Sequence, residues 1–147
     1  MYAISCQGTA TKFYQQTISN VKKIASDWLY IYPSEIRDIL IRIKIKYNNP
    51  IIYVAENGIS NDGKIPLDEN LKDNQRTQAY IDHLSYLRKT IEEGVDVRGF
   101  FVWSLLENFE WNCGYTVRFG IYHVDFKDGL KRHPKKSAIW FKSYLQK

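Results

Sequence analysis

Two short apolar runs constrain the fold of this chain more than any other feature of its sequence. The first covers residues 51–55 and is rich in β-branched side chains, and the second covers residues 97–104. Continuous apolar runs of this length are typical of strands that are buried on both faces of a parallel sheet. Each run follows a segment with helical spacing, so the alternation predicts a parallel α/β sheet or barrel.

Two helices are predicted to precede these strands. Residues 34–47 carry apolar side chains at helical spacing, Ser34 can cap their start, and residues 48–50 (Asn-Asn-Pro) end them. Residues 39–46 also alternate like a strand, which stays an alternative there. Residues 74–93 form the longer predicted helix. Its inward face is expected to hold Tyr80, Leu84, Leu87 and Ile91.

The rest of the chain adds a hairpin and a last helix. Residues 60–73 are polar and contain an Asn-Asp-Gly turn signal. Residues 120–126 and 129–133 predict the two strands of a hairpin, and residues 135–145 predict a helix. The inward side chains of that helix are expected to be Ile139, Trp140 and Tyr144. The predicted order is therefore helix, strand, helix, strand, hairpin and helix.

The composition is that of a globular chain. The 147 residues are 44% hydrophobic and 25% charged, and no apolar run is long enough to cross a bilayer, so no membrane partner is expected. Residues 1–20 have no clear period, which leaves a disordered start or a start that is not the natural beginning of a domain. We therefore divide the sequence into an irregular, atypical start, 1–24, and a folded part, 25–147.

The net charge of +5 is unevenly distributed. Residues 56–126 hold 7 basic against 12 acidic side chains, whereas residues 1–55 and 127–147 are basic. The basic side chains are interleaved with apolar helix positions and form no nucleic-acid-binding motif, so no nucleic-acid partner is expected. A basic surface that binds acidic partners stays an alternative.

Polar residues follow both apolar runs directly. Glu56 and Asn57 end the first run, and the second leads to Glu110 and Trp111. Active sites of α/β barrels lie at the carboxyl ends of the strands, so these are candidate site residues. An acid at a strand end can also be bound by backbone amides or an arginine, and that structural role stays open for Glu56.

Aromatic side chains surround the second group. Trp103 precedes Glu110 by 7 residues, and Phe119 follows Trp111 by 8. Carboxylates accept hydrogen bonds from hydroxyls, and tryptophan offers an apolar face and an indole donor, so this mixture suits a sugar. Core packing is an equally supported role for Trp103 and Phe119.

No metal or phosphate site is expected. His83, His123 and His133 are scattered along the chain, and no glycine-rich phosphate loop occurs. Cys113 has no neighbouring histidine, so we interpret it as a small packing residue rather than a nucleophile.

Several motifs, in order along the chain, resemble family 1 glycoside hydrolases, the β-glucosidases. Residues 53–58 (Tyr-Val-Ala-Glu-Asn-Gly) resemble that family's nucleophile motif, which usually has Thr in place of Ala55. Residues 103–111 resemble its second signature, which usually has Asp in place of Glu107. Further matching stretches are residues 27–33, 114–120 and 137–141. The resemblance covers about residues 25–145 and is closest to plant members.

The resemblance implies a role for each candidate residue. Glu56 would be the nucleophile that forms a covalent glycosyl-enzyme, which water then hydrolyses with retained configuration. Glu110 would bind the O4 and O6 hydroxyls of glucose, and Trp111 would donate its indole hydrogen to O3. The other implied roles are a floor under the sugar ring for Trp103, a border of the O6 pocket for Phe119, and a supporting place behind the site for Asn57.

The resemblance also implies parts that this sequence does not contain. Retaining hydrolysis needs an acid/base carboxylate about 5–5.5 Å from the nucleophile. The family carries it in a Thr-x-Asn-Glu-Pro motif on an earlier strand, and no Asn-Glu-Pro occurs here. A (β/α)8 barrel needs eight strands and about 250 residues. We therefore expect an α/β fold that is an incomplete C-terminal portion of a TIM barrel: the last two βα units, a hairpin and the final helix.

The first functional hypothesis is a C-terminal fragment of a plant-type β-glucosidase, from a truncated or partial gene model, that does not hydrolyse β-D-glucosides alone. The alternative is a non-catalytic product that binds a sugar or other chains. The implied partner is a β-D-glucoside, and no cofactor is expected. The aglycone, the oligomeric state and the compartment are not predicted, because family members can be secreted, vacuolar or plastid.

Overall fold

A parallel sheet of three strands forms the centre of this computed structural model, which describes residues 2–5, 22–23, 25–26 and 28–146. In spatial order its strands are β1 (Tyr2–Ser5), β4 (Ile52–Asn57) and β6 (Val97–Val102). β4 pairs in parallel with both neighbours. The prediction that the two apolar runs form parallel strands is confirmed, and β1 adds a third strand that was not predicted.

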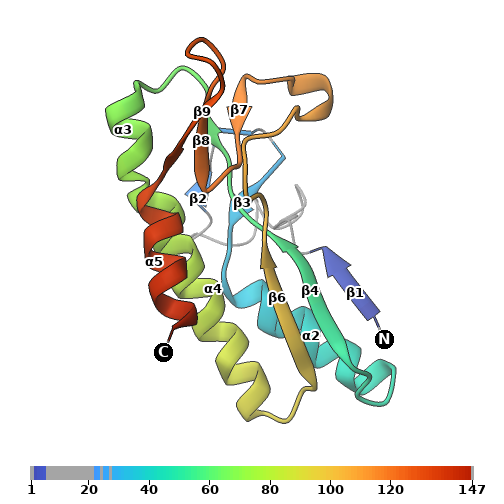
Figure 1. Cartoon of the computed structure of the whole chain (residues 1–147). Coiled ribbons are helices and arrows are strands. Elements are labelled where there is room, and N and C mark those ends of the chain that lie inside the picture. The colour runs from blue at the N-terminus through green and yellow to red at the C-terminus, as the bar shows by residue number, and fades with distance from the viewer. Residues whose placement is uncertain (1, 6–21, 24, 27, 147) are drawn as a thin grey trace.

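Long helices pack against this sheet (Figure 1). α2 (Ser34–Lys46) and α4 (Asn74–Glu92) contact each other, and α5 (Lys136–Leu145) contacts α4. The core between α2, α4 and β4 consists of Ile36, Leu40, Ile52, Val54, Leu84, Leu87 and Val95. The three predicted helices are therefore confirmed, and residues 39–46 are helical rather than extended.

The start of α2 differs from the prediction. Ser34 is the first helical residue, and Pro33 occupies the capping position without any side-chain hydrogen bond. Proline suits a helix start because its fixed φ is helical and its missing N–H would have no partner there. The expected Ser34 cap is therefore wrong, and the proline marks the boundary instead.

The two central strands are not buried on both faces. Ile52 and Val54 of β4 are fully buried against the helices, whereas Tyr53 between them is only half-buried. On β6, Phe100 packs against the core and the next side chain, Phe101, is 57% exposed. The prediction of two-sided burial is wrong because, among the described residues, helices cover only one face of the sheet.

Three apolar helix positions expected to face inward are exposed. Ile91 and Tyr144 line an open apolar groove of about 280 Å³ between α4, β6 and α5. Ile139 lines a second groove beside Trp140, which is itself half-buried as expected. Helical periodicity predicts which side of each helix is apolar. It does not show which positions on that side lie beyond the packing contact with the neighbouring strand or helix.

The polar segment 60–73 also contains a short helix, α3 (Leu67–Lys72), that was not predicted.

Short antiparallel pairs accompany the carboxyl end of the sheet. β8 (Tyr122–Asp125) and β9 (Lys131–Pro134) form the predicted hairpin, which is confirmed with shorter strands. The other pairs are β2 (Lys22–Lys23) with β3 (Tyr30–Ile31), and β5 (Asn61–Asp62) with β7 (Val117–Arg118). Figure 1 shows β7, β8 and β9 beyond the arrowheads of β4 and β6, where a site at the strand ends would lie.

The start of the chain is only partly described. Within residues 1–24, which were expected to be irregular, the structure contains β1 and β2, and residues 1, 6–21 and 24 lie outside the described part. The boundary at residue 25 stays a prediction. None of the described helices is both long and apolar enough to cross a membrane.

The core between α2 and the sheet predicts a strong contrast between two positions on one helix. Leu40 is 0% exposed and Ile45 is 78% exposed. We expect Leu40→Ala to lower the free energy of unfolding by about 2–5 kcal/mol, because it leaves a cavity in the core. Ile45→Ala should change it by less than about 0.5 kcal/mol. Chemical denaturation of the two variants measures both values, and equal losses would contradict this packing.

Candidate active site

The carboxyl ends of β4 and β6 are joined directly. The backbone N–H of Trp103, just after β6, donates to the carbonyl oxygen of Asn57, the last residue of β4, at 2.8 Å. The chain also passes close by Gly58, where a Cβ atom would lie 1.8 Å from the Trp103 carbonyl oxygen. Glu56, half-buried near the end of β4, is thereby held beside the start of the segment that leads to Glu110.

The segment after β6 runs along residues 119–122. A cis peptide bond joins Trp103 to Ser104. The carbonyl oxygen of Ser104 accepts from Ile121 N–H at 2.8 Å, and that of Leu105 accepts from Tyr122 N–H at 3.0 Å. These bonds fix the path of residues 103–106 before the chain reaches the candidate sugar-binding residues.

Glu110 and Trp111 lie together at a surface cleft of about 310 Å³. The cleft is lined by Trp28, Glu110, Trp111, Asn112 and Cys113. Glu110 is buried, while the Trp111 side chain is 85% exposed. Trp111 has a φ of +40°, a left-handed conformation that costs energy for a residue with a side chain. Such strain at a single exposed indole is typical of a functional site.

Trp103 and Phe119 occupy more enclosed positions. Phe119 is 0% exposed and belongs to a second core cluster with Leu29, Ile31, Ile59, Ala79 and Val117. Trp103 is half-buried and packs against this cluster, and its indole N–H has no hydrogen-bond partner among the described residues. Neither residue lines the cleft. For Phe119 the structure supports the core-packing alternative, and its border on a sugar pocket stays a prediction.

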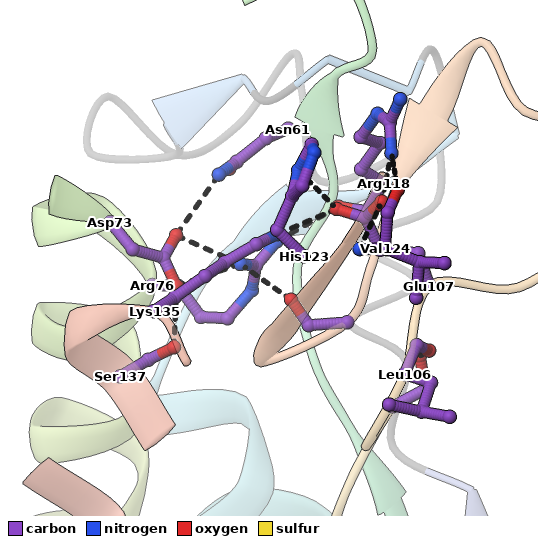
Figure 2. A network of polar contacts seen from close by, with 12 residues as sticks. Asn61, Asp73, Arg76, Leu106, Glu107, Arg118, His123, Val124, Lys135 and Ser137 are labelled. Carbon is purple, nitrogen blue, oxygen red and sulfur yellow. Dashed lines mark hydrogen bonds and ion pairs between the residues drawn. The ribbon is translucent and has the colours of Figure 1, made fainter. Parts of the chain in front are cut away.

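Glu107 forms a buried network with residues that are distant in the sequence (Figure 2). Its side chain is almost fully buried, and the guanidinium of Arg118 pairs with its Oε2 atom. Lys135 Nζ lies 3.0 Å and His123 Nδ1 lies 3.4 Å from Oε1. The backbone N–H of Val124 donates to Oε2 at 3.3 Å. These contacts fasten the segment before Glu110 to β7, to β8 and to the residue that precedes α5.

A second buried ion pair adjoins the Glu107 network. Arg76 Nη1 donates to both carboxylate oxygens of Asp73 at 2.8 Å, and both side chains are fully buried. Ser137 Oγ donates to the same carboxylate, and Asn61 Nδ2 donates to it at 3.0 Å. Arg76 Nη2 also donates to the Arg118 carbonyl oxygen at 2.8 Å, which links the two networks.

The sequence contained signals for part of this arrangement. Arg76 lies four residues before Tyr80, on the inward face predicted for the long helix, and a charge at such a position indicates a buried partner. Glu107 departs from the family pattern, but spacing alone does not predict its partners. Trp28 lies in a matching stretch that implies no role for it, and no pattern in the sequence indicates a role for Asn108.

Burial perturbs the pKa of two basic side chains in these networks, Lys135 and His123. It lowers the pKa of Lys135 to about 8, with the Arg76 charge acting in the same direction and Glu107 opposing both. Burial also lowers the pKa of His123, against the attraction of Glu107. Among the described residues, no group of three or more His, Cys, Asp or Glu side chains is placed to hold a metal ion.

Comparison with known proteins identifies the family of this fold. The sequence model of "Glycosyl hydrolase family 1" matches residues 3–147. The chain belongs to this family. It is 53% identical over 125 residues to "Beta-glucosidase 12" of Oryza sativa subsp. indica and 52% identical to "Beta-glucosidase 13" of Arabidopsis thaliana. Each match covers 84% of this chain and 24% of the relative, so the chain spans about a quarter of their length.

Solved structures of family members contain the same arrangement. A rice β-glucosidase superimposes with a TM-score of 0.80 and 46% identity, covering 82% of this chain and 26% of that one. A β-glucosidase from Trichoderma harzianum superimposes with a TM-score of 0.82 and 39% identity, covering 84% of this chain and 27% of that one. A β-glucosidase from Thermotoga maritima superimposes with a TM-score of 0.79 and 39% identity, covering 88% of this chain and 29% of that one. The predicted fold class, a C-terminal portion of a (β/α)8 barrel, is confirmed.

The lowered pKa of Lys135 predicts a distinctive pH dependence of stability. Between about pH 8 and pH 10 the folded chain has released the Lys135 proton while the unfolded chain, with an ordinary lysine pKa near 10.4, retains it. The free energy of unfolding should therefore rise with pH across this window, by up to about 2–3 kcal/mol. Burial also raises the pKa of Tyr80, which lowers the free energy of unfolding as the pH rises. That opposite effect begins only near pH 10, where the tyrosine of the unfolded chain starts to ionise.

Two neighbouring lysines separate this effect from other titrations. Lys135→Met should abolish the rise, whereas Lys136→Met, at an exposed position, should retain it. Urea denaturation at pH 7.5, 8.5 and 9.5 measures the difference between the two variants. Identical pH profiles would show that Lys135 does not titrate in this range.

Proposed function

We propose that this chain provides the nucleophile side of a site that hydrolyses β-D-glucosides with retained configuration. The acid/base carboxylate of that site is supplied by polypeptide other than residues 1–147. The observation that carries the proposal is the position of Glu56 at the carboxyl end of β4. The chain shares about half of its aligned residues with β-glucosidases of rice and Arabidopsis thaliana. That end of the strands is where (β/α)8 barrels hold their catalytic groups.

Glu56 performs the covalent step in this proposal. Its carboxylate attacks the anomeric carbon, the bond to the aglycone oxygen breaks, and the acid/base residue protonates that oxygen. Water, deprotonated by the same residue, then attacks the anomeric carbon and releases Glu56 and the sugar. The backbone bond between Trp103 and Asn57 supports this role, because it fixes the residue next to Glu56.

Glu110 and Trp111 bind the sugar in this proposal. Each carboxylate oxygen can accept more than one hydrogen bond, so the bond from Asn108 leaves Glu110 capacity for sugar hydroxyls. The exposed indole of Trp111 provides a donor and an apolar face beside it. Trp28, which also lines the cleft, adds a second ring surface for the sugar or its aglycone.

The acidic residues of this region do not provide the missing acid. Glu107 is buried away from solvent, and its carboxylate is already occupied by Arg118 and Lys135. Glu110 lies in the cleft as a hydroxyl acceptor. A general acid must hold a proton within hydrogen-bond reach of the leaving oxygen, so hydrolysis at this site needs another carboxylate.

Complementation tests this division of the site. The full chain is co-expressed with the part of a rice β-glucosidase that lies outside the match, about three quarters of that protein. We expect aryl β-glucoside hydrolysis from the mixture and none from either part alone, because only the mixture contains both carboxylates. Glu56→Gln should reduce the activity of the mixture by at least about 10⁴-fold, since it removes the nucleophile.

The matched control is Glu92→Gln, an exposed residue of α4 paired with Arg88, which should leave the activity unchanged. Hydrolysis by the chain alone that Glu56→Gln abolishes would contradict the missing acid/base. Activity of the mixture that survives Glu56→Gln would contradict the nucleophile.

A further inference from the structure

Asn108 connects the Glu110 carboxylate to the segment that follows β6. Its Nδ2 atom donates to Glu110 Oε2 at 2.7 Å. Its Oδ1 atom lies 3.2 Å from the Ser104 hydroxyl, which also lies 2.6 Å from the Leu106 carbonyl oxygen. A carboxylate only accepts hydrogen bonds, so the amide must turn its NH₂ group toward Glu110 and its oxygen toward Ser104. The Glu110 carboxylate therefore determines the orientation of the Asn108 amide.

The backbone at Asn108 is itself fixed by its neighbour. Glu107 is bound by Arg118 of β7, by His123 and Val124 of β8, and by Lys135. Figure 2 shows the side chains of Arg118, His123 and Lys135 converging on the Glu107 carboxylate from separate elements. A carboxylate held by several buried partners has little freedom to move, because each displacement leaves a buried charge unpaired. Asn108 therefore extends from a rigid point toward Glu110.

Glu110 needs such support because of what surrounds it. The next residue, Trp111, is 85% exposed in a left-handed conformation, and Gly114 closes the turn by accepting from Glu110 N–H at 2.8 Å. The Glu110 side chain itself is buried at the cleft and receives the charge-assisted bond from Asn108. Bonds of this kind to a charged acceptor are stronger than those between neutral groups.

We propose that Asn108 is a positioning residue that holds the Glu110 carboxylate toward the cleft for a sugar hydroxyl, on a segment that Glu107 fixes to β7 and β8. The role of the sugar in this inference rests on the proposed function, whereas the hydrogen bond between Asn108 and Glu110 does not depend on it. Asn108 does not line the cleft. Its effect therefore passes entirely through Glu110.

A double-mutant cycle in the complemented mixture tests this dependence. Asn108→Ala should lower kcat/KM for an aryl β-glucoside by about 10- to 100-fold, the range expected for losing a hydrogen bond to a charged group. Glu110→Ala should lower it further, and the double variant should equal Glu110→Ala alone. A merely structural role for Asn108 would make the two losses multiply, and that result would overturn the proposal. Asn74→Ala, at an exposed position on α4, is the control and should leave kcat/KM unchanged.

The same variants separate this proposal from the proposed function. An inactive mixture, or one insensitive to Glu56→Gln, would refute the proposed function. In either case the side-chain amide signals of Asn108 in the ¹⁵N-labelled chain still test the hydrogen bond. We expect Glu110→Ala to shift one amide proton upfield and speed its exchange, with Glu92→Ala as the unaffected control. Asn108 signals that do not respond to Glu110→Ala would overturn the positioning role.

Discussion

The buried carboxylate of Glu107 determines how the parts of this chain that carry the candidate site fit together. Removing a carboxylate from water costs several kcal/mol unless charged and hydrogen-bonding partners replace the solvent. Here those partners come from β7, from β8 and from the residue before α5. The Asp73–Arg76 pair extends the arrangement, because Arg76 also donates to the Arg118 carbonyl oxygen. The segment that ends at Glu110 and Trp111 therefore keeps one position relative to the sheet.

The one-sided burial of the sheet explains where a site can form. Helices cover the face that carries Val54 and Phe100, and the alternate positions Tyr53 and Phe101 turn to the other face. In a (β/α)8 barrel that other face lies inside the barrel, where side chains from several strands fill the interior. The exposure of Phe101 is thus what a part of such a barrel should show. Glu56 follows these positions along β4, at the edge from which catalytic groups project.

Much of the fold could be predicted from local patterns, and most of the site could not. The strands and long helices followed from apolar runs and helical spacing, because both depend on neighbouring residues. Burial was less predictable: Ile91, Ile139 and Tyr144 have the right spacing but face open grooves. The partners of Glu107 lie 11 to 28 residues away, at Arg118, His123 and Lys135, and no period connects them. Glu110 and Trp111 both line the surface cleft, whereas Phe119 belongs to the core.

The central claim, that Glu56 is the group that bonds to the sugar, can be tested by trapping the covalent intermediate. A 2-fluoro β-glucoside with a good leaving group reacts at the nucleophile and then hydrolyses slowly, because the fluorine destabilises the oxocarbenium-like transition state. Peptide mapping by mass spectrometry of the labelled, complemented mixture locates the adduct. The account predicts one adduct for each 147-residue chain, on the peptide that contains Glu56, and none in the Glu56→Gln variant. An adduct on Glu110, or on the complementing polypeptide instead of this chain, would contradict it.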